Sequence, residues 1–335
     1  MGALLALALP SCDPAPGLSG RKTALVYRDF YLRHNEIPGE VEHPDRLRSV
    51  MTHLRQTGLL DRVERLSPTP APLEWILQVH TPEYVNRIRD SCRWIKDERI
   101  PIDSGDVSVT GRSFDVAVCA VGGVLGAVDA VMAGRVQNAF CAVRPPGHHA
   151  TASHAMGFCI FNNVAIAARY LQRRHALGRV FIVDWDCHHG NGTQDIFDAD
   201  PTVFYFSTHQ SPFYPKTGFP NETGVGKAEG TKMNVLLKKG ATDADILRIY
   251  REQLRPAVLE FKPEFILISA GFDAARGDLL GGLDLTPAGY AEMTRIVKEL
   301  AAEVCKGRIV SVLEGGYSLK QLPPCVEAHL RALME

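Results

Sequence analysis

Residues 180–192 read VFIVDWDCHHGNG: four consecutive apolar residues, then two carboxylates and two imidazoles. An apolar run without alternation predicts a strand buried on both faces, as in parallel sheets covered by helices. Ligands of such sheets bind beyond the carboxyl ends of the strands, which is where this polar run begins. Because side chains at i and i+2 of a strand share a face, Asp186 and His188 can point two metal-binding atoms the same way. The alternative is a polar turn rich in His and Asp without function.

Strand-like and helical patterns alternate along the rest of the chain. Such alternation is typical of βαβ units, in which helices cover both faces of a parallel sheet. The sequence therefore predicts an α/β fold, a single three-layer domain whose parallel sheet has about eight strands. We expect strands at residues 23–27, 139–143, 180–184, 203–207, 233–237, 265–269 and 309–313. We expect helices at residues 46–55, 82–90 with Thr81 as N-cap, 113–133, 162–174, 243–261 begun by Asp243, and 286–305.

The composition is that of an ordinary globular protein. The chain has 335 residues, a formal net charge of −1 and 45% hydrophobic residues. A near-neutral charge gives no support for binding nucleic acid or an anionic membrane surface. We see no run of about 18 consecutive apolar residues, so no transmembrane helix is expected. Residues 1–21 are rich in Pro, Gly and Ser after an apolar start, and we expect them to be a loose leader. No long linker divides the rest of the chain, which favours one domain over residues 22–335.

The N-terminal residues and the cysteines indicate in which cellular compartment the protein is expected. Residues 2–9 resemble the apolar core of a signal peptide, but no Lys or Arg precedes them. The eight cysteines form no Cys-x-x-Cys pair, and Cys119, Cys141 and Cys159 stand among apolar residues. We therefore expect reduced, buried thiols in a cytoplasmic protein that is not exported.

A second polar loop, RPPGHHA at residues 144–150, follows the predicted strand 139–143. Its two prolines stiffen the loop, and Gly147 lets the backbone approach a neighbour closely. His148 and His149 suit proton transfer because imidazole titrates near neutral pH. The alternative is a pair of surface histidines.

Two more strand-end loops carry Asp273 and Tyr317. A buried, unpaired carboxylate is costly, so Asp273, just past strand 265–269, is expected to be a third metal ligand; a helix N-cap is the alternative. Tyr317 follows Glu314-Gly315-Gly316, and its phenol can donate a hydrogen bond to a developing oxyanion. The alternative for Tyr317 is simple packing.

Together the loops predict a metal-dependent hydrolytic site at one edge of the sheet. Two Asp and one His leave a position open for water, which is the arrangement of catalytic zinc sites. Oxygen-rich ligation also suits iron, cobalt or manganese. A bound water whose pKa falls towards about 7 is a nucleophile at neutral pH.

The motifs resemble those of the zinc-dependent histone deacetylase family, within the arginase/deacetylase superfamily. The matching segments occur in order over most of residues 25–320: RPPGHHA (144–150), GFCIFNN (157–163), DWDCHHGNGTQ (184–194), GFDAARGD (271–278) and LEGGY (313–317). Asn191 and the LEGGY ending resemble class II members and their bacterial relatives. The resemblance implies an arginase/deacetylase-like fold and a catalytic domain over residues 22–335.

The resemblance also implies roles for the site residues. His149 would be the general base and then the general acid, with His148 beside it as an electrostatic partner. Asp184 would orient His148, and Asn191 would face His149. Tyr317 would polarise the acetyl carbonyl and stabilise the oxyanion.

The resemblance further implies metal and cation sites. Zinc, with Fe²⁺ or Co²⁺ as substitutes, would be bound by Asp186, His188 and Asp273. Potassium would occupy an inner site at Asp184, Asp186, His188 and Ser207, largely through backbone carbonyls. A second, weaker cation site would lie at Phe197, Asp200 and Val203.

The substrate would enter a narrow tunnel. By the same resemblance, Gly157 and Phe158 line it, Tyr214 forms the opposite wall, and Asp106 at the rim holds the substrate backbone. Leu280 stands where polyamine-specific members carry an acidic residue, which favours acyl-lysine in a peptide or protein. Residues 43–46, HPDR, shorten the family's N-terminal His-Pro-Glu segment, so the loop near the tunnel mouth is expected to differ.

The predicted function is removal of acetyl groups from lysine side chains, with an acetylated protein, peptide or small amine as the partner. One alternative is a deacetylase of acetylpolyamines or another small amide. A second is an acyl-lysine-binding protein without catalysis, which the intact set of ligands, histidines and tyrosine disfavours. A third, a binuclear manganese ureohydrolase, needs more carboxylates than these loops contain. The oligomeric state is not predicted.

Overall fold

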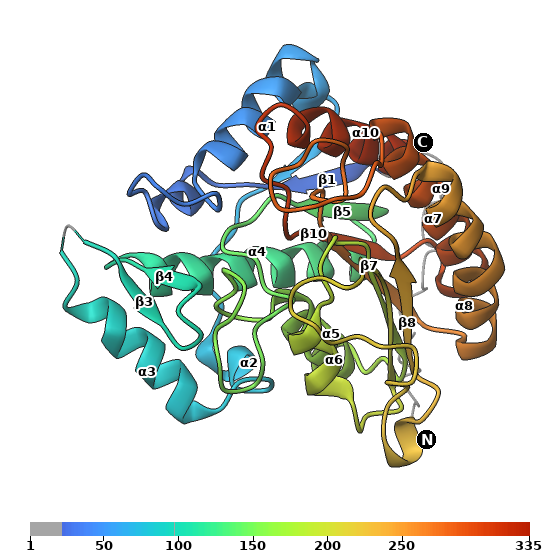
Figure 1. Cartoon of the computed structure of the whole chain (residues 1–335), viewed down its shortest axis with the longest axis horizontal. Helices are drawn as coiled ribbons and strands as arrows, with labels where there is room; N and C mark the ends of the chain where they lie inside the picture. Colours follow the sequence, from blue (N-terminus) through green and yellow to red (C-terminus); the bar gives the residue numbers. More distant parts are fainter. Residues whose placement is uncertain (1–21, 97) are drawn as a thin grey trace, which may run out of the picture.

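The computed structural model describes residues 22–96 and 98–335. At its centre is one eight-stranded sheet with the order β2-β1-β5-β10-β9-β6-β7-β8 (Figure 1), in which every neighbouring pair is parallel. Its strands are β1 (Thr23–Val26), β2 (Glu64–Leu66), β5 (Asn138–Cys141), β6 (Val180–Asp184), β7 (Val203–Gln210), β8 (Lys232–Leu237), β9 (Phe265–Ala270) and β10 (Ile309–Leu313). The leader and signal-like segment predicted in residues 1–21 lie outside the described residues.

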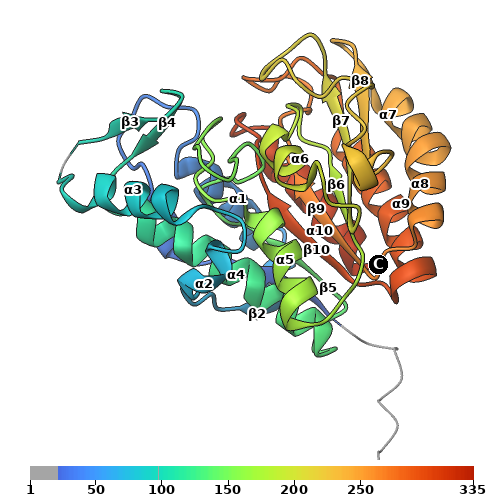
Figure 2. The same cartoon turned by 90° about the horizontal axis from the view of Figure 1, so that it is seen from below.

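Helices cover both faces of the sheet, which confirms the predicted three-layer α/β fold (Figures 1 and 2). One layer holds α4 (Ser113–Met132), α5 (Asn163–Arg174) and α6 (Asn191–Phe197). The opposite layer holds α1 (Asp45–Gln56), α7 (Asp243–Ile249), α8 (Arg255–Phe261), α9 (Pro287–Cys305) and α10 (Leu322–Met334).

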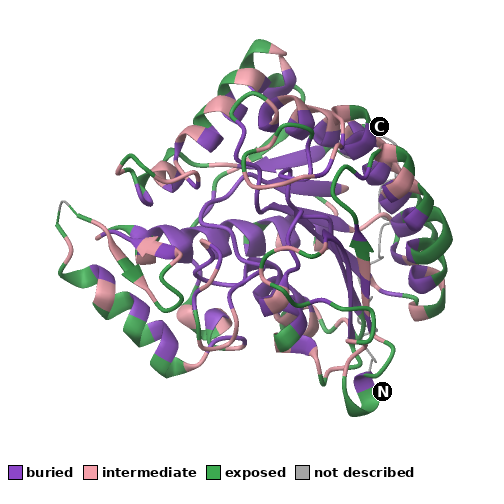
Figure 3. Ribbon diagram, in the orientation of Figure 1, coloured by how far each residue is buried: buried purple, intermediate pink, exposed green. Residues whose placement is uncertain are grey.

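The central strands are buried on both faces. Every residue of β5, β6, β9 and β10 is buried (Figure 3), whereas the edge strand β8 mixes buried and partly exposed residues. Two-sided burial explains why these strands read as continuous apolar runs instead of alternating ones. Each described cysteine is free and buried, as expected.

Among the described residues, α4 is the one helix that is long and apolar enough to cross a membrane. Its apolar run is interrupted by polar residues, so the criterion of 18 consecutive apolar residues did not detect it. However, 78% of its apolar window is buried inside the fold. It contacts α5, β5 and β10. Its apolar composition is therefore that of a core helix that packs against the sheet and against a neighbouring helix of its own layer.

The predicted helix 243–261 begins at Asp243 as expected, but it is not one continuous α-helix. Its N-cap is Thr242, which forms a capping box with Asp245, while Asp243 accepts hydrogen bonds from Thr286 at the start of α9. In addition, α7 and α8 are joined by a π-helical turn, Tyr250–Leu254. The turn precedes Pro256, which has no N–H and cannot continue the α-helical hydrogen-bond pattern.

Several short elements were not predicted. An antiparallel hairpin of β3 (Ile100–Ile102) and β4 (Val107–Val109) lies beside α3 (Pro82–Arg93), away from the main sheet (Figure 1). Also missed were β2, α2 (Leu73–Ile76), α6 and α10. The first three are too short to show a period, and two prolines at the start of α10 obscured it although proline is favoured in a first helical turn. Thr81 caps α3 as predicted, accepting from the Tyr84 N–H.

Candidate active site

The four predicted loops meet because their strands are neighbours. β5, β10, β9 and β6 are consecutive in the sheet and parallel, so their carboxyl ends share one edge. The loops that follow contain residues 144–150, 314–317, 271–278 and 185–192 respectively. Segments that are far apart in the sequence therefore surround a single site.

Asp186, His188 and Asp273 form one buried cluster. His188 Nδ1 lies 3.0 Å from Asp186 Oδ1 and 3.1 Å from Asp273 Oδ2. One ligand atom from each residue lies within 4.8 Å of the other two. The ring is oriented by its other nitrogen, because His188 Nε2 donates to the carbonyl of Leu280 at 3.1 Å. This leaves Nδ1 facing both carboxylates, as expected of a metal-binding imidazole.

Backbone amides hold the two carboxylates in place. Asp186 accepts from the Gly315 N–H at 2.8 Å, and Asp273 accepts from the Cys187 N–H at 2.7 Å. A Cβ at position 315 would overlap the carboxylates of both residues, so only glycine allows the strand-end loop to approach this closely.

The electrostatics of the cluster favour a cation. Burial raises the pKa of Asp273, and the neighbouring Asp186 carboxylate raises it further. Two adjacent buried carboxylates repel each other unless a positive charge lies between them. Two carboxylates and one imidazole are ligands that fit zinc, iron or cobalt. The residues present therefore fit the metal that the sequence predicted.

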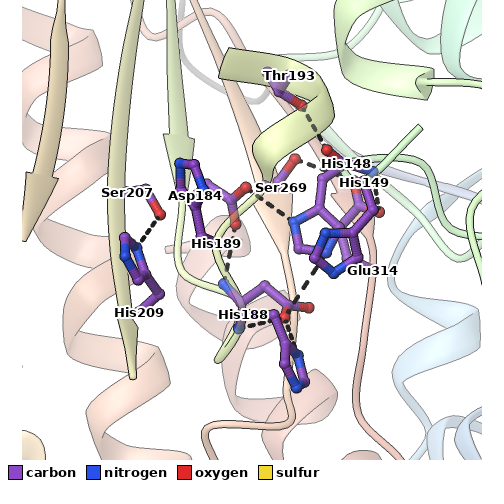
Figure 4. A network of polar contacts seen from close by, with 12 residues as sticks. His148, His149, Asp184, His188, His189, Thr193, Ser207, His209, Ser269 and Glu314 are labelled. Carbon is purple, nitrogen blue, oxygen red and sulfur yellow. Dashed lines mark hydrogen bonds and ion pairs between the residues drawn. The ribbon is translucent and has the colours of Figure 1, made fainter. Parts of the chain in front are cut away.

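The two histidines of the second loop have opposite environments (Figure 4). His148 Nδ1 lies 3.1 Å from Asp184 Oδ2; burial alone would lower its pKa, but Asp184 and Asp186 outweigh burial and raise it to about 10. His149 donates from Nδ1 to the Asn191 side-chain oxygen at 2.8 Å. Burial and the neighbouring His148 lower the pKa of His149 well below its usual value. At neutral pH one ring is thus a cation and the other a neutral base with a free Nε2.

Glu314 is a site residue that the sequence analysis did not single out. Its buried carboxylate accepts from the backbone N–H groups of Gly147 and His148 at 2.7 and 3.2 Å, and from the Ser269 hydroxyl at 3.0 Å (Figure 4). Burial raises the pKa of Glu314 to about 7. Glu314 therefore ties the histidine loop to β9 and β10.

Tyr317 is positioned from two sides. The guanidinium carbon of Arg46 lies 4.9 Å from the Tyr317 ring centroid, and Phe158 lies on another side with its centroid 5.8 Å away. Asp278 accepts from the Tyr317 N–H at 2.7 Å. Burial raises the pKa of Tyr317 well above its usual value, so the phenol keeps its proton. Arg46 and Asp278 had no assigned role in the sequence analysis, although both lie within quoted motifs.

A cavity of about 550 Å³ opens onto these residues. All five predicted substrate-binding residues line it, together with His149, His188 and Tyr317; the five are Asp106, Gly157, Phe158, Tyr214 and Leu280. Other lining residues were not predicted: Gln210, Phe213, Lys239, Leu279, Gly281 and Gly282.

Three contacts shape the cavity walls. Phe213 stacks on His188, with ring centroids 5.3 Å apart, and Tyr214 donates to Asp106 at 2.7 Å. Gly157 and Phe158 both have left-handed backbone, with φ of 54° and 64°. A Cβ at Gly157 would overlap the His149 ring, so glycine is required where the wall meets the histidine.

The predicted inner cation residues are neighbours. Asp184 on β6 pairs in register with Ser207 on β7. His209 donates from Nε2 to the Gly218 carbonyl at 3.0 Å and accepts the Ser207 hydroxyl proton on Nδ1 at 2.9 Å, which leaves the Ser207 oxygen free to bind a cation. Oxygen donors of this kind fit potassium.

The residues predicted for a second cation site lie around the loop before β7. Asp200 donates from its backbone N–H to the Phe197 carbonyl at 2.9 Å, and Val203 begins β7. Here the Nζ atom of Lys232 donates to the carbonyls of Asp200 and Val203 at 3.4 and 3.1 Å.

Comparison with known proteins identifies the family of the chain. A family model described as the histone deacetylase domain matches residues 40–333. The chain is 41% identical over 314 residues to a probable deacetylase of Archaeoglobus fulgidus, covering 93% of this chain and 86% of that protein. It is 39% identical over 325 residues to the human polyamine deacetylase HDAC10, covering 93% of this chain and 48%, about half, of that protein.

A solved structure gives the same result. The HDA15 HD domain has a TM-score of 0.89 to this chain at 37% identity, covering 94% of this chain and 88% of that one. On these grounds the chain belongs to the histone deacetylase family.

Proposed function

We propose that this chain is a metal-dependent amidohydrolase that removes acetyl groups from lysine side chains of proteins or peptides. The observation that carries the proposal is the convergence of Asp186, His188 and Asp273 in one buried cluster. Its member His188 lines the same cavity as His149 and Tyr317. A nucleophile, a base and an oxyanion donor can act on one carbonyl there.

Asp186, His188 and Asp273 would hold the metal, which is zinc by family resemblance, with Fe²⁺ or Co²⁺ as substitutes. When bound, the ion supplies a Lewis acid that polarises the substrate carbonyl and lowers the pKa of water. The three side chains contribute two negative charges and one neutral imidazole, so a divalent ion is balanced in the buried site.

His149 would carry the proton. Its Nδ1 is engaged with Asn191, so Nε2 is the atom that accepts a proton from the attacking water and returns it to the leaving amine. His148, held as a cation by Asp184, provides positive charge beside it. Tyr317, protonated at all working pH values, would donate to the carbonyl oxygen as negative charge develops there.

The cavity suits an uncharged acyl-lysine stem. Phe158, Tyr214 and Leu280 give it an apolar wall, and Asp106 at its lining carries the carboxylate for the substrate backbone. Asp106 already accepts from the Gly157 N–H at 3.1 Å and the Tyr214 hydroxyl at 2.7 Å, which holds it in one orientation. An oriented carboxylate can accept from peptide N–H groups.

The test combines metal content with hydrolysis of an acetyl-lysine peptide. The wild-type chain, loaded with zinc, should release acetate, and Asp186→Ala should lose metal and activity together. Metal retained by Asp186→Ala would move the ligand assignment to other residues. A metal-loaded wild type inactive on acyl-lysine peptides and on small acetylated amines would overturn the hydrolase proposal.

Hydrolysis of acetylpolyamines is the second candidate, since one relative is named a polyamine deacetylase. Two lining residues count against a polycationic substrate: Leu280 is apolar, and Lys239 adds a positive charge. Kinetics on acetylspermidine and an acetyl-lysine peptide, side by side, separate the two. A larger kcat/KM for acetylspermidine would favour the second candidate.

Two further assignments belong to this proposal. The oxygens of Asp184 and Ser207 support an inner monovalent cation, potassium by family resemblance. Free, buried cysteines throughout the described residues support a reducing compartment such as the cytoplasm.

A further inference from the structure

Lys232, the first residue of β8, is a buried lysine with a complete set of oxygen partners. It is 2% exposed. Its Nζ lies 2.7 Å from Thr231 Oγ1, 3.1 Å from the Val203 carbonyl and 3.4 Å from the Asp200 carbonyl. Thr231 donates its own proton to the Ala228 carbonyl at 2.6 Å, so its oxygen is an acceptor towards the lysine. The three N–H donors of an ammonium group therefore meet three acceptors.

The carbonyls are held by contacts that do not involve Lys232. Arg169 pairs with the Asp200 carboxylate at 2.5 Å, and its guanidinium carbon lies 4.7 Å from the Phe197 ring centroid. The other Asp200 oxygen accepts from the Thr202 N–H at 2.8 Å. The loop from Phe197 to Val203 is thus fixed from outside, with two backbone carbonyls directed at the ammonium.

The charge of Lys232 survives burial. Burial lowers its pKa to about 8, against the opposing effect of Asp200 and Asp198, so the group remains mainly protonated at pH 7. None of its three hydrogen-bond partners is a carboxylate oxygen. A cation surrounded by backbone carbonyls and a hydroxyl is the arrangement in which proteins bind potassium.

We infer that the ammonium group of Lys232 takes the place of a free monovalent cation at the carbonyls of Asp200 and Val203. These residues, with Phe197, are the ones at which family resemblance predicts the second cation. An ammonium group and a potassium ion are of similar size and bind carbonyl oxygens in the same way, so one set of carbonyls cannot hold both. The second site therefore contains a cation that is covalently part of the chain.

The presence of a lysine in place of a free ion has a consequence for stability. Lys232 links β8 to the loop that precedes β7, and β7 carries Ser207 of the inner cation group. If a free potassium ion connected β8 to this loop, its removal would weaken the connection, because a bound ligand stabilises the folded state by mass action. A lysine provides the same link at any potassium concentration.

The first experiment locates thallium(I), a potassium analogue, by anomalous diffraction from crystals of the full chain. In the wild type we expect no thallium at the carbonyls of Asp200 and Val203, and in Lys232→Ala we expect thallium there. Thallium at these carbonyls in the wild type would overturn the inference, and so would their failure to bind it in Lys232→Ala.

The second experiment measures Tm in potassium chloride and in choline chloride at equal ionic strength. Potassium should raise the Tm of Lys232→Ala on the order of 3 °C or more beyond any rise that it causes in the wild type. Lys232→Met should be destabilised without this extra gain, because its side chain fills the space an ion needs. The exposed Lys238→Ala should behave as the wild type.

Failure of Lys232→Ala to fold is also informative. Folding in potassium chloride but not in choline chloride supports the inference, since the free ion then replaces the lysine. Failure to fold in both salts contradicts it.

Discussion

The guanidinium group of Arg46, fully buried at the start of α1, lies over the ring of Tyr317, with its central carbon 4.9 Å from the ring centroid. The same group donates to the carbonyls of Gly316 at 2.6 Å and Glu314 at 2.5 Å. One side chain therefore fixes both the backbone of the tyrosine loop and the ring. In the proposed mechanism Arg46 would act through Tyr317, as a positioning residue.

Arg46→Lys should lower kcat by roughly tenfold or more while leaving KM nearly unchanged. A lysine keeps the positive charge beside Glu42 but cannot form the two-pronged contact with the carbonyls, and small misplacements of a catalytic group are costly. Steady-state kinetics with a Tm measurement test this, with the half-exposed Arg48→Lys on the same helix as the control. A wild-type kcat in Arg46→Lys would exclude the positioning role.

Tyr317→Phe should lose about 3 kcal/mol of transition-state stabilisation, or roughly a hundredfold or more in kcat, because one oxyanion donor is removed. Its Tm should hardly change, since the ring contacts with Arg46 and Phe158 remain. The measurement is hydrolysis of an acetyl-lysine peptide by the zinc-loaded enzyme. Activity within a few-fold of wild type would rule out the oxyanion role.

Glu42→Gln should destabilise the fold by roughly 3–5 kcal/mol, because it leaves two buried arginines without a counter-charge. Glu42 pairs with Arg144 at 2.6 Å and with Arg46 at 2.9 Å, and all three side chains are almost wholly buried. Urea denaturation measures the loss. The exposed pair of Glu36 with Arg33 provides the control, and Glu36→Gln should change stability by less than about 1 kcal/mol.

The buried carboxylate of Glu42 should also make the stability of the fold depend on pH. Burial alone would raise the pKa of Glu42, but Arg144 and Arg46 outweigh burial and lower it from 4.5 to about 2. The carboxylate therefore contributes its full stabilisation above pH 4.5, and this is lost as the pH falls from 4.5 towards 2. Arg144, Arg46 and His34 face the group, and His34 has a pKa lowered to about 3. Unfolding free energies of wild type and Glu42→Gln should converge over this window; a constant difference would contradict the assignment.

Leu280→Glu should shift the preference towards acetylpolyamines. A carboxylate on the cavity wall attracts a polycationic substrate, so the kcat/KM ratio of acetylspermidine to acetyl-lysine peptide should rise roughly tenfold. Leu77→Glu, the same change at an exposed leucine of another region, should leave the ratio unaltered. An unchanged ratio in Leu280→Glu would show that this position does not select substrates.

The strands and the fold class were predictable because they depend on local patterns. β6 has the predicted bounds, Val180–Asp184, since four consecutive apolar residues lead directly to the carboxylate at which the strand ends. Its parallel neighbours follow from the alternation of strands with helices. The prediction was wrong where one pattern spans two elements: residues 243–261 read as one helix, but the π-helical turn Tyr250–Leu254 divides it into α7 and α8.

The cluster of candidate metal ligands could be predicted from residue types, but the contacts that hold the surrounding loops together could not. Asp186, His188 and Asp273 stand directly after strands whose ends must meet in a parallel sheet, so their proximity follows from topology. No sequence pattern near Glu314 predicts that its carboxylate accepts hydrogen bonds from the backbone N–H groups of Gly147 and His148 on another loop.

Periodicity and strand-end chemistry therefore sufficed for the layers, the sheet and the cluster of ligands, because each depends on residues close together in the chain. Packing between distant segments decided the rest. In the sequence Arg46 is an ordinary polar residue at the start of a predicted helix, and Lys232 is a polar residue just before a predicted strand. Only folding brings each charge to carbonyl groups that lie up to 270 residues away in the sequence. The hydrogen bonds between them are stronger there because water is excluded.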